Sequence, residues 1–132
     1  MSARILIVDD NAGVRSTIRD FLALHGFRVC GQAADGKAAI REVRELKPDI
    51  VLLDINLPGI NGIRTAAEIL RVSRRIKIVF LTVHNTPGTR NATRMWSQGF
   101  VSKSAVATEL IPTLSRVAGM VGRRTTLDTG MY

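Results

Sequence analysis

The sequence predicts a single α/β domain: a doubly wound (βα)5 sandwich in which a parallel five-stranded sheet lies between two layers of helices. Short apolar runs of strand length alternate with longer segments of helical period, and no repeat or low-complexity stretch interrupts them. With 45% hydrophobic residues, the 132-residue chain has enough apolar mass for one core. Right-handed crossovers between parallel strands cover both sheet faces, and we expect the order 2-1-3-4-5, the standard one for five strands.

The first half of the chain predicts two strand–helix units. The expected elements are a strand at 4–8, a helix at 12–25, a strand at 27–33 and a helix at 36–46. Gly26 stands just after the first helix, a position that favours glycine. Asp35 can cap the second helix, and Pro48 follows that helix and ends it.

The second half predicts three further units. The expected strands are 50–53, 76–81 and 100–102, and the expected helices are 62–72, 87–98 and 106–121. Pro87 suits the first turn of its helix. Pro112 lies inside the last helix, where the missing N–H should kink the first turns at a cost of up to ~3 kcal/mol. We assign residues 1–121 to the domain and 122–132 to a polar tail or the start of a linker.

The composition argues against several classes of protein. No run approaches the ~20 apolar residues of a membrane span, and the N-terminus lacks a signal-peptide pattern. Cys30 is the single cysteine, which excludes a disulfide framework and a thiolate metal site, and its apolar surroundings predict a small buried hydrophobe. We therefore expect a cytoplasmic protein without a membrane partner.

The net charge of +8 is the unusual bulk property of the chain. It could serve an acidic partner or nucleic acid, but the basic residues are spread over several predicted helices, which favours a solvated basic surface. The tightest basic group precedes a strand and should lie at the sheet end opposite Asp54; its members are Arg71, Arg74, Arg75 and Lys77. No aromatic residues interleave with this group, as a single-strand binder would require.

Asp54 directly follows the apolar run 50–53, whose length and β-branched content suit a strand buried on both faces. Open α/β sheets place their ligand sites at the carboxyl ends of the strands. A strand-end Asp often caps the next helix, but that helix begins only at Gly62, too far away for Asp54 to cap it. We therefore expect Asp54 to have a chemical role.

Four predicted strands deliver polar residues to the same edge: Asp9 and Asp10 after the first, Asp54 after the third, Thr82 after the fourth and Lys103 after the fifth. Three crowded carboxylates would raise a pKa or destabilise the fold, and a hard divalent cation such as Mg2+ would remove the conflict. A carboxylate beside Mg2+ can attack phosphorus and form an aspartyl phosphate. Lys103 would then neutralise phosphoryl charge, and the Thr82 hydroxyl would donate to a phosphoryl oxygen.

With these motifs assembled, the chain resembles the receiver domain of two-component response regulators, closest to the NarL/FixJ type. The resemblance covers residues 4–121 and rests on four segments in the family's order and spacing: ILIVDD, DIVLLDINLPGING, FLT and GFVSK. It implies the flavodoxin-like receiver fold. It also implies a domain that catalyses phosphorylation and dephosphorylation of its own aspartate, rather than a conventional enzyme.

The resemblance implies a role for each site residue. A sensor histidine kinase, or a small phosphodonor, would phosphorylate Asp54. Mg2+, or Mn2+ in its place, would be bound by Asp10, Asp54 and the backbone carbonyl of Asn56, with Asp9 contributing through water. Lys103 matches the family's phosphate-binding lysine, and Thr82 and Phe100 match its switch pair. Phosphorylation would alter a protein-interaction face and could bring two copies together as a homodimer.

Three positions depart from the family pattern. Val83 stands where the family often has a small residue, so we expect it to narrow access to Asp54, and we give the adjacent His84 a modulating role. Trp96 and Ser97 replace a common Gly-Ala pair, and we expect Trp96 to be packed in or against the core. Phe100 lacks the hydroxyl of the more common Tyr.

Three alternatives remain to be weighed. A flavodoxin-like cofactor binder would need a Ser/Thr/Gly-rich loop after the first strand, where Asp9 and Asp10 stand. A haloacid-dehalogenase-type phosphatase would need a second Asp at the position of Asn56. A receiver fragment of a helix-turn-helix transcription factor is the third alternative. Nothing after residue 121 is long enough for such a DNA-binding module, so we expect DNA binding only if an output domain lies beyond this chain.

Overall fold

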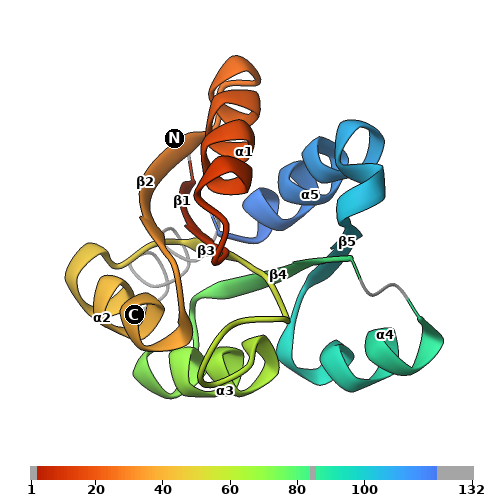
Figure 1. Cartoon of the computed structure of the whole chain (residues 1–132). Helices are drawn as coiled ribbons and strands as arrows, with labels where there is room; N and C mark the ends of the chain where they lie inside the picture. Colours follow the sequence, from red (N-terminus) through yellow and green to blue (C-terminus); the bar gives the residue numbers. More distant parts are fainter. Residues whose placement is uncertain (1–2, 84–85, 122–132) are drawn as a thin grey trace, which may run out of the picture.

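The computed structural model describes residues 3–83 and 86–121. Its strands form one parallel sheet in the order β2-β1-β3-β4-β5, which confirms the predicted fold and topology (Figure 1). The strands are β1 (Arg4–Val8), β2 (Arg28–Ala33), β3 (Ile50–Leu53), β4 (Lys77–Thr82) and β5 (Gly99–Ser102). The longer helices are α1 (Ala12–Leu24), α2 (Gly36–Leu46), α3 (Gly62–Val72), α4 (Pro87–Thr93) and α5 (Ile111–Val121).

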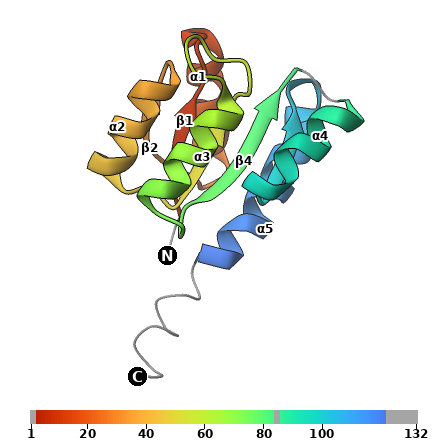
Figure 2. The ribbon, with the colours of Figure 1, turned by 90° about the horizontal axis from the view of Figure 1, so that it is seen from below.

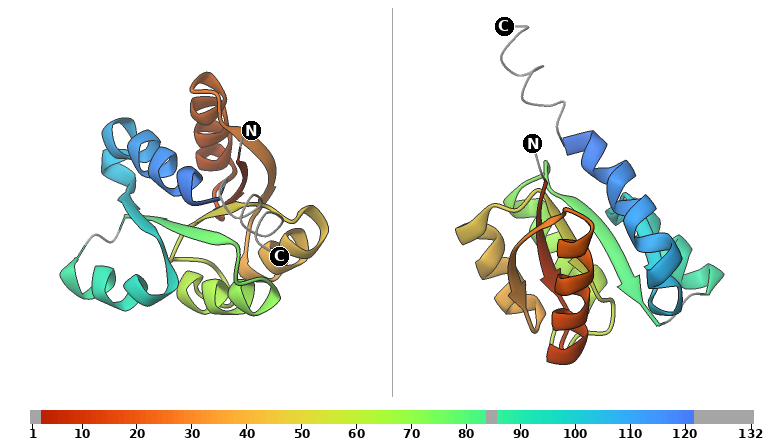
Figure 3. Two further views of the ribbon diagram at one scale, coloured as in Figure 1. Left: turned by 180° about the vertical axis from the view of Figure 1, so that it is seen from behind. Right: turned by 90° about the horizontal axis from the view of Figure 1, so that it is seen from above.

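Helices α1 and α5 lie on one side of the sheet, whereas α2 and α3 lie on the other with α4 beside α3 (Figures 1 and 3). Alternate residues of each strand therefore enter two different cores. In β1, Ile5 and Ile7 join the core under α1 and α5, and Leu6 and Val8 join the core under α2 and α3. This explains why the central strands β1, β3 and β4 carry buried apolar runs, whereas the edge strands β2 and β5 contain polar residues and are only partly buried.

Local capping bonds set the helix starts as the sequence predicts. Asp35 Oδ1 accepts a hydrogen bond of 2.8 Å from Ala38 N at the start of α2. Asn11 and Asn61 cap α1 and α3 in the same way, at 3.0 and 2.9 Å. Gly26 follows α1 with a φ of 81°, a left-handed conformation that glycine adopts without strain. The observed strand ends lie within one residue of the predicted ones.

The helix predicted at 87–98 is wrong in its length. The α-helix α4 ends at Thr93, and a 3-10 turn (η1) spans Arg94–Trp96. Side chains compete with the helical backbone there: Thr93 Oγ1 donates to Arg90 O at 3.0 Å, and Ser97 Oγ donates to Thr93 O at 3.1 Å. Such local bonds offer carbonyl groups a partner outside the regular helical ladder.

The helix predicted at 106–121 spans those residues, but it is not a single regular α-helix. A π-helical turn spans Val106–Leu110, and the regular helix α5 begins only at Ile111. Pro112 therefore lies in the first turn of α5, where a missing N–H is tolerated. The expected cost of a proline in a helix interior does not apply at this position.

The carboxyl ends and the amino ends of the parallel strands lie at opposite ends of the sheet. The carboxyl ends of the strands carry the predicted acidic cluster. Figure 2 shows the side of the sheet covered by α2 and α3, with α4 beside α3 and the arrow of β4 pointing toward its carboxyl end. No helix of the described residues has the length and apolar character needed to cross a membrane. The predicted tail at 122–132 and His84 lie outside the described residues, so the domain boundary at residue 121 stays a prediction.

Candidate functional site

Strand pairing brings three carboxylates together at the carboxyl edge. Val8 and Leu53 are register partners in the adjacent strands β1 and β3, so the residues that follow them leave the sheet side by side. The carboxylates of Asp9, Asp10 and Asp54 each offer an oxygen within 4.8 Å of the others. Asp9 and Asp54 are buried, at 1% and 4% exposure, whereas Asp10 is exposed. The predicted acidic cluster is therefore present.

Lys103 reaches this cluster from the end of β5, the outermost strand on that side of the sheet. It directly follows β5, and its side chain reaches past β4 to place Nζ 2.6 Å from Asp9 Oδ2 and 3.2 Å from Asp54 Oδ2. The side chain is 21% exposed, so the ion pairs are largely shielded from water. One ammonium group faces three carboxylates, which leaves two negative charges to be balanced.

Burial and neighbouring charges shift the acid–base properties of the site. Burial raises the pKa of Asp54 above its ordinary value; the N–H of Asn56 and the charge of Lys103 oppose that rise, and Asp9 adds to it. Burial alone would lower the pKa of Lys103, but the carboxylates of Asp9 and Asp54 outweigh it and raise that pKa overall. Lys103 is therefore held in its charged form beside both carboxylates.

The donor set fits a hard divalent cation. Every side chain of the acidic cluster offers carboxylate oxygens, the ligands that Mg2+ prefers. Asp9 Oδ2 is buried, and although Lys103 Nζ lies close to it, this oxygen accepts no well-directed hydrogen bond from the described residues. A buried carboxylate oxygen without such a bond is costly unless a cation compensates it. The residues present therefore suit Mg2+.

The loop after β3 folds tightly over Asp54. Asn56 N donates to Asp54 Oδ1 at 3.1 Å, and the exposed Asn56 side chain lies at the rim of the site. Gly62 N donates to Ile55 O at 2.7 Å, and a Cβ at Gly62 would lie 2.1 Å from the backbone oxygen of Asp54. Only glycine allows α3 to start so close to the end of β3. The role of the Asn56 carbonyl as a metal ligand stays a prediction.

The other predicted site residues occupy the neighbouring strand ends. Thr82 is fully buried at the end of β4, where it pairs in register with Ser102 of β5. Val83, the next residue, is 64% exposed. The switch roles of Thr82 and Phe100, and the gating role of Val83, stay predictions.

Phe100 has a partner that the sequence reasoning missed. The ring is half-buried against the core under α3, and the guanidinium carbon of Arg90 in α4 lies 4.6 Å from its centroid. This is a cation–π contact between a helix and the strand beside it. The chain contains many arginines, and only the packing of α4 determines that Arg90 is the one that contacts Phe100. Trp96 is partly buried against the same core, as expected.

Comparisons with known proteins agree with this geometry. The family model of the response regulator receiver domain matches residues 5–115. The chain is 36% identical over 116 residues to the response regulator GacA of Pseudomonas viridiflava, which covers 86% of this chain and 54% of that protein. It is 32% identical over 119 residues to the chemotaxis protein CheY of Thermotoga maritima, which covers 89% of this chain and 99% of that protein. The chain thus spans about half the length of GacA and nearly all of CheY.

Solved structures of response regulators also match this fold. A LuxR-family two-component response regulator from Aurantimonas sp. SI85-9A1 superposes with a TM-score of 0.85 at 32% identity, covering 90% of this chain and 86% of the other. The receiver domain of NarL from Mycobacterium tuberculosis does so with a TM-score of 0.82 at 28% identity, covering 89% and 97%. These matches confirm the resemblance and displace the flavodoxin-like and phosphatase alternatives. The chain belongs to the response regulator receiver domains and takes part in two-component phosphorelay signalling.

Proposed function

We propose that Asp54 is the residue that receives the phosphoryl group in this domain, from a sensor histidine kinase or a small phosphodonor. The observation that supports this most directly is the position of Lys103, whose Nζ lies within 3.2 Å of both a buried Asp9 oxygen and a buried Asp54 oxygen. A lysine so placed can leave its carboxylate partners and balance an incoming phosphoryl group.

The transfer proceeds by attack of an Asp54 carboxylate oxygen on phosphorus. The phosphorus–nitrogen bond of the kinase phosphohistidine breaks, and its electron pair returns to the imidazole. The N–H of Asn56 holds the carboxylate in place, and Lys103 neutralises charge on the phosphoryl oxygens. Asp10, Asp54 and the Asn56 carbonyl, with Asp9 through water, would hold Mg2+, whose charge would offset the repulsion between the acceptor carboxylate and the phosphoryl group.

Phosphorylation then alters the protein-interaction face near α4 and β5. In this proposal the Thr82 hydroxyl donates to the phosphoryl group, a bond to a charged acceptor worth ~1.5–3 kcal/mol. That is enough to change a two-state population about tenfold or more. Phe100 turns inward at the same time, and two phosphorylated copies associate through the altered face.

The test is phosphorylation with acetyl phosphate and Mg2+, followed by intact mass. We expect one added phosphoryl group in the parent and none in Asp54→Asn. The matched control is Asp20→Asn, because Asp20 is exposed on α1 away from the site; it should be labelled like the parent. Continued labelling of Asp54→Asn would move the acceptor elsewhere. Thr82→Ala should accept the phosphoryl group but respond weakly in dimerisation.

The chain is alternatively the receiver part of a helix-turn-helix transcription factor. The observation that favours this alternative is that the chain spans 54% of GacA. DNA binding would then belong to an output domain, and the whole would act in the cytoplasm. Reading the gene beyond the codon for Tyr132 decides between the two: an output domain encoded in frame supports the transcription factor, and a stop codon supports a stand-alone receiver.

A further inference from the structure

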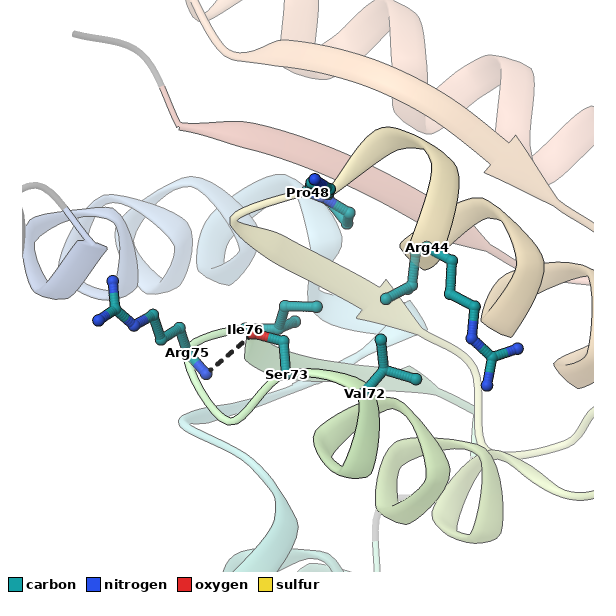
Figure 4. Close-up of a pocket in the computed structure, with 8 residues that line it drawn as sticks. Arg44, Pro48, Val72, Ser73, Arg75 and Ile76 are labelled. Atoms are coloured by element: carbon teal, nitrogen blue, oxygen red, sulfur yellow. Dashed lines mark hydrogen bonds between the residues drawn. The ribbon is translucent and has the colours of Figure 1, made fainter.

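Two hollows meet at the last turn of α3, at the amino edge of the sheet and away from Asp54. The first, of about 360 Å3, lies between the ends of α2 and α3. Figure 4 shows Arg44 and Pro48 on its α2 side and Val72, Ser73 and Ile76 on the other side. The second, of about 660 Å3, lies between α3 and the 3-10 turn η1. Val72 and Ser73 line both hollows, so together they form one surface, the α3-end surface.

This surface has a single sign of charge. None of the residues that line it is acidic, and five are basic: Arg44, Lys47, Arg71, Arg74 and Arg75. All five are exposed. Arg71 has a loose pair with Glu68 at 3.6 Å, and exposed pairs of this kind contribute little. Within the described part of the chain, the Arg44, Lys47 and Arg74 side chains form no ion pair. Of the basic group that the sequence placed opposite Asp54, Arg71, Arg74 and Arg75 line the two hollows, whereas Lys77 lines neither.

Apolar side chains lie among these charges. Met95 is 78% exposed and Val72 is 37% exposed, two of the few large apolar residues that the described part of the chain leaves in solvent. Trp96 and Leu70 line the same hollow as Met95 and are half-buried. Arginine, methionine and aromatic residues are the types enriched in protein–protein interfaces. Exposed apolar groups beside a hollow also mark interaction sites more often than scattered single residues do.

We propose that the α3-end surface binds an acidic segment of a partner protein that carries apolar side chains on one face. Carboxylates of the segment pair with the arginines, and its apolar side chains cover Val72, Met95 and the exposed part of Trp96. The surface extends across two hollows, which favours an extended or helical segment over a compact small anion. Nucleic acid would satisfy the arginines but would leave Met95 and Val72 without apolar partners. The basic side chains and Met95 of this surface are already exposed in this structure, so the segment can bind without phosphorylation.

The single tryptophan of the chain, Trp96, gives the experiment its readout. The unphosphorylated full chain is titrated with a synthetic peptide that presents Glu on one helical face and Leu on the other. Fluorescence and calorimetry both follow the binding, so a silent tryptophan does not hide it. We expect saturable binding that weakens as salt rises. Absence of binding by both methods would overturn the proposal.

Charge-matched variants test whether binding depends on the α3-end surface or only on the net charge of the protein. The double variant Arg71→Glu/Arg74→Glu should weaken binding roughly tenfold or more, equivalent to ~1.4 kcal/mol. Arg19→Glu/Arg41→Glu changes the net charge equally at exposed positions outside both hollows, and should leave binding nearly unchanged. An equal loss in the two double variants would show that only bulk charge acts, and would contradict the proposal.

The apolar contribution and the competing ligand need their own controls. Met95→Ser should weaken binding, and because Met95 is exposed the fold should not change. A peptide with Ser in place of Leu should bind much more weakly. Two results would overturn the proposal in favour of a purely anionic ligand. The first is equal binding of the peptide with Ser in place of Leu. The second is tighter binding of random-sequence duplex DNA that depends on Arg71 and Arg74 but not on Met95. Asp54→Asn should bind the peptide like the parent, which separates this test from that of the proposed function.

Discussion

Lys103 Nζ lies 2.6 Å from Asp9 Oδ2, although the two residues follow strands that are separated in the sheet by β3 and β4. The long lysine side chain crosses the carboxyl edge and holds two buried carboxylates close together. Electrostatic repulsion within the acidic cluster is therefore balanced in part by a residue 94 positions away in the chain, Lys103 against Asp9. The stability of the domain should depend on that charge.

Lys103→Met is expected to destabilise the domain when Mg2+ is absent. It leaves Asp9 and Asp54 buried without a counter-charge, at a cost of up to ~3 kcal/mol, below the range for fully buried pairs because Lys103 is partly exposed. Adding Mg2+ should stabilise this variant more than the parent, since the cation supplies the missing charge. Urea unfolding with and without Mg2+ measures both effects. Lys37→Met, at an exposed position on α2, is the control; a loss equal to that of Lys103→Met would refute the prediction.

Asp54→Asn should raise the melting temperature at neutral pH in the absence of Mg2+. The pKa of Asp54 is raised in the folded state, chiefly by burial, so the folded protein holds this proton more tightly than the unfolded chain does. Keeping Asp54 ionised therefore costs stability above the folded-state pKa. That cost falls as the pH drops through the raised pKa and disappears below the ordinary carboxyl pKa, near ~4.

Calorimetric scans at neutral and acidic pH check the direction of this pH dependence. The gain from Asp54→Asn should be a few degrees at neutral pH and should shrink on acidification. A gain that grew as the pH fell would mean that the folded state depresses the pKa of Asp54 rather than raises it. Asp20→Asn, which removes an exposed carboxylate, should show little gain at either pH.

Val83→Ala should speed both phosphorylation by small donors and spontaneous loss of the phosphoryl group. Val83 follows Thr82 at the carboxyl edge and is 64% exposed, and we expect its side chain to narrow the approach to Asp54. Stopped-flow fluorescence from Trp96 and the decay of the phosphorylated mass follow the two rates. Rates equal to those of the parent would show that this side chain does not restrict access.

The Arg90–Phe100 contact should contribute measurable coupling between α4 and β5. A cation–π contact at a partly exposed site is worth ~0.5–1 kcal/mol. Arg90 has other interactions, so single variants mix several effects. A double-mutant cycle with Arg90→Ala and Phe100→Leu isolates the pair, and urea unfolding provides the free energies. A coupling energy within error of zero would show that the stacking contributes nothing.

Much of this domain follows from local sequence patterns. The apolar runs of β1, β3 and β4 specify central strands because both faces of a doubly wound sheet are covered, and Asp35 and Gly26 mark helix ends because their preferences act over a few residues. The strand order is the standard one for a five-stranded doubly wound sheet. It delivers Asp9, Asp10, Asp54, Thr82 and Lys103 to one edge, which is why the sequence alone predicts the candidate site.

Other features depend on the tertiary structure. The helix predicted at 87–98 was too long, because side-chain hydrogen bonds to backbone carbonyl groups interrupt the α-helix after Thr93. The segment predicted at 106–121 is helical throughout, but its first turn, ahead of Pro112, is π-helical. The stacking of Arg90 on Phe100 depends on how α4 packs, which no local pattern encodes. The concentration of dispersed arginines around two hollows is likewise a consequence of folding. It arises because α2, α3 and the 3-10 turn η1, distant in sequence, end at the same edge of the sheet.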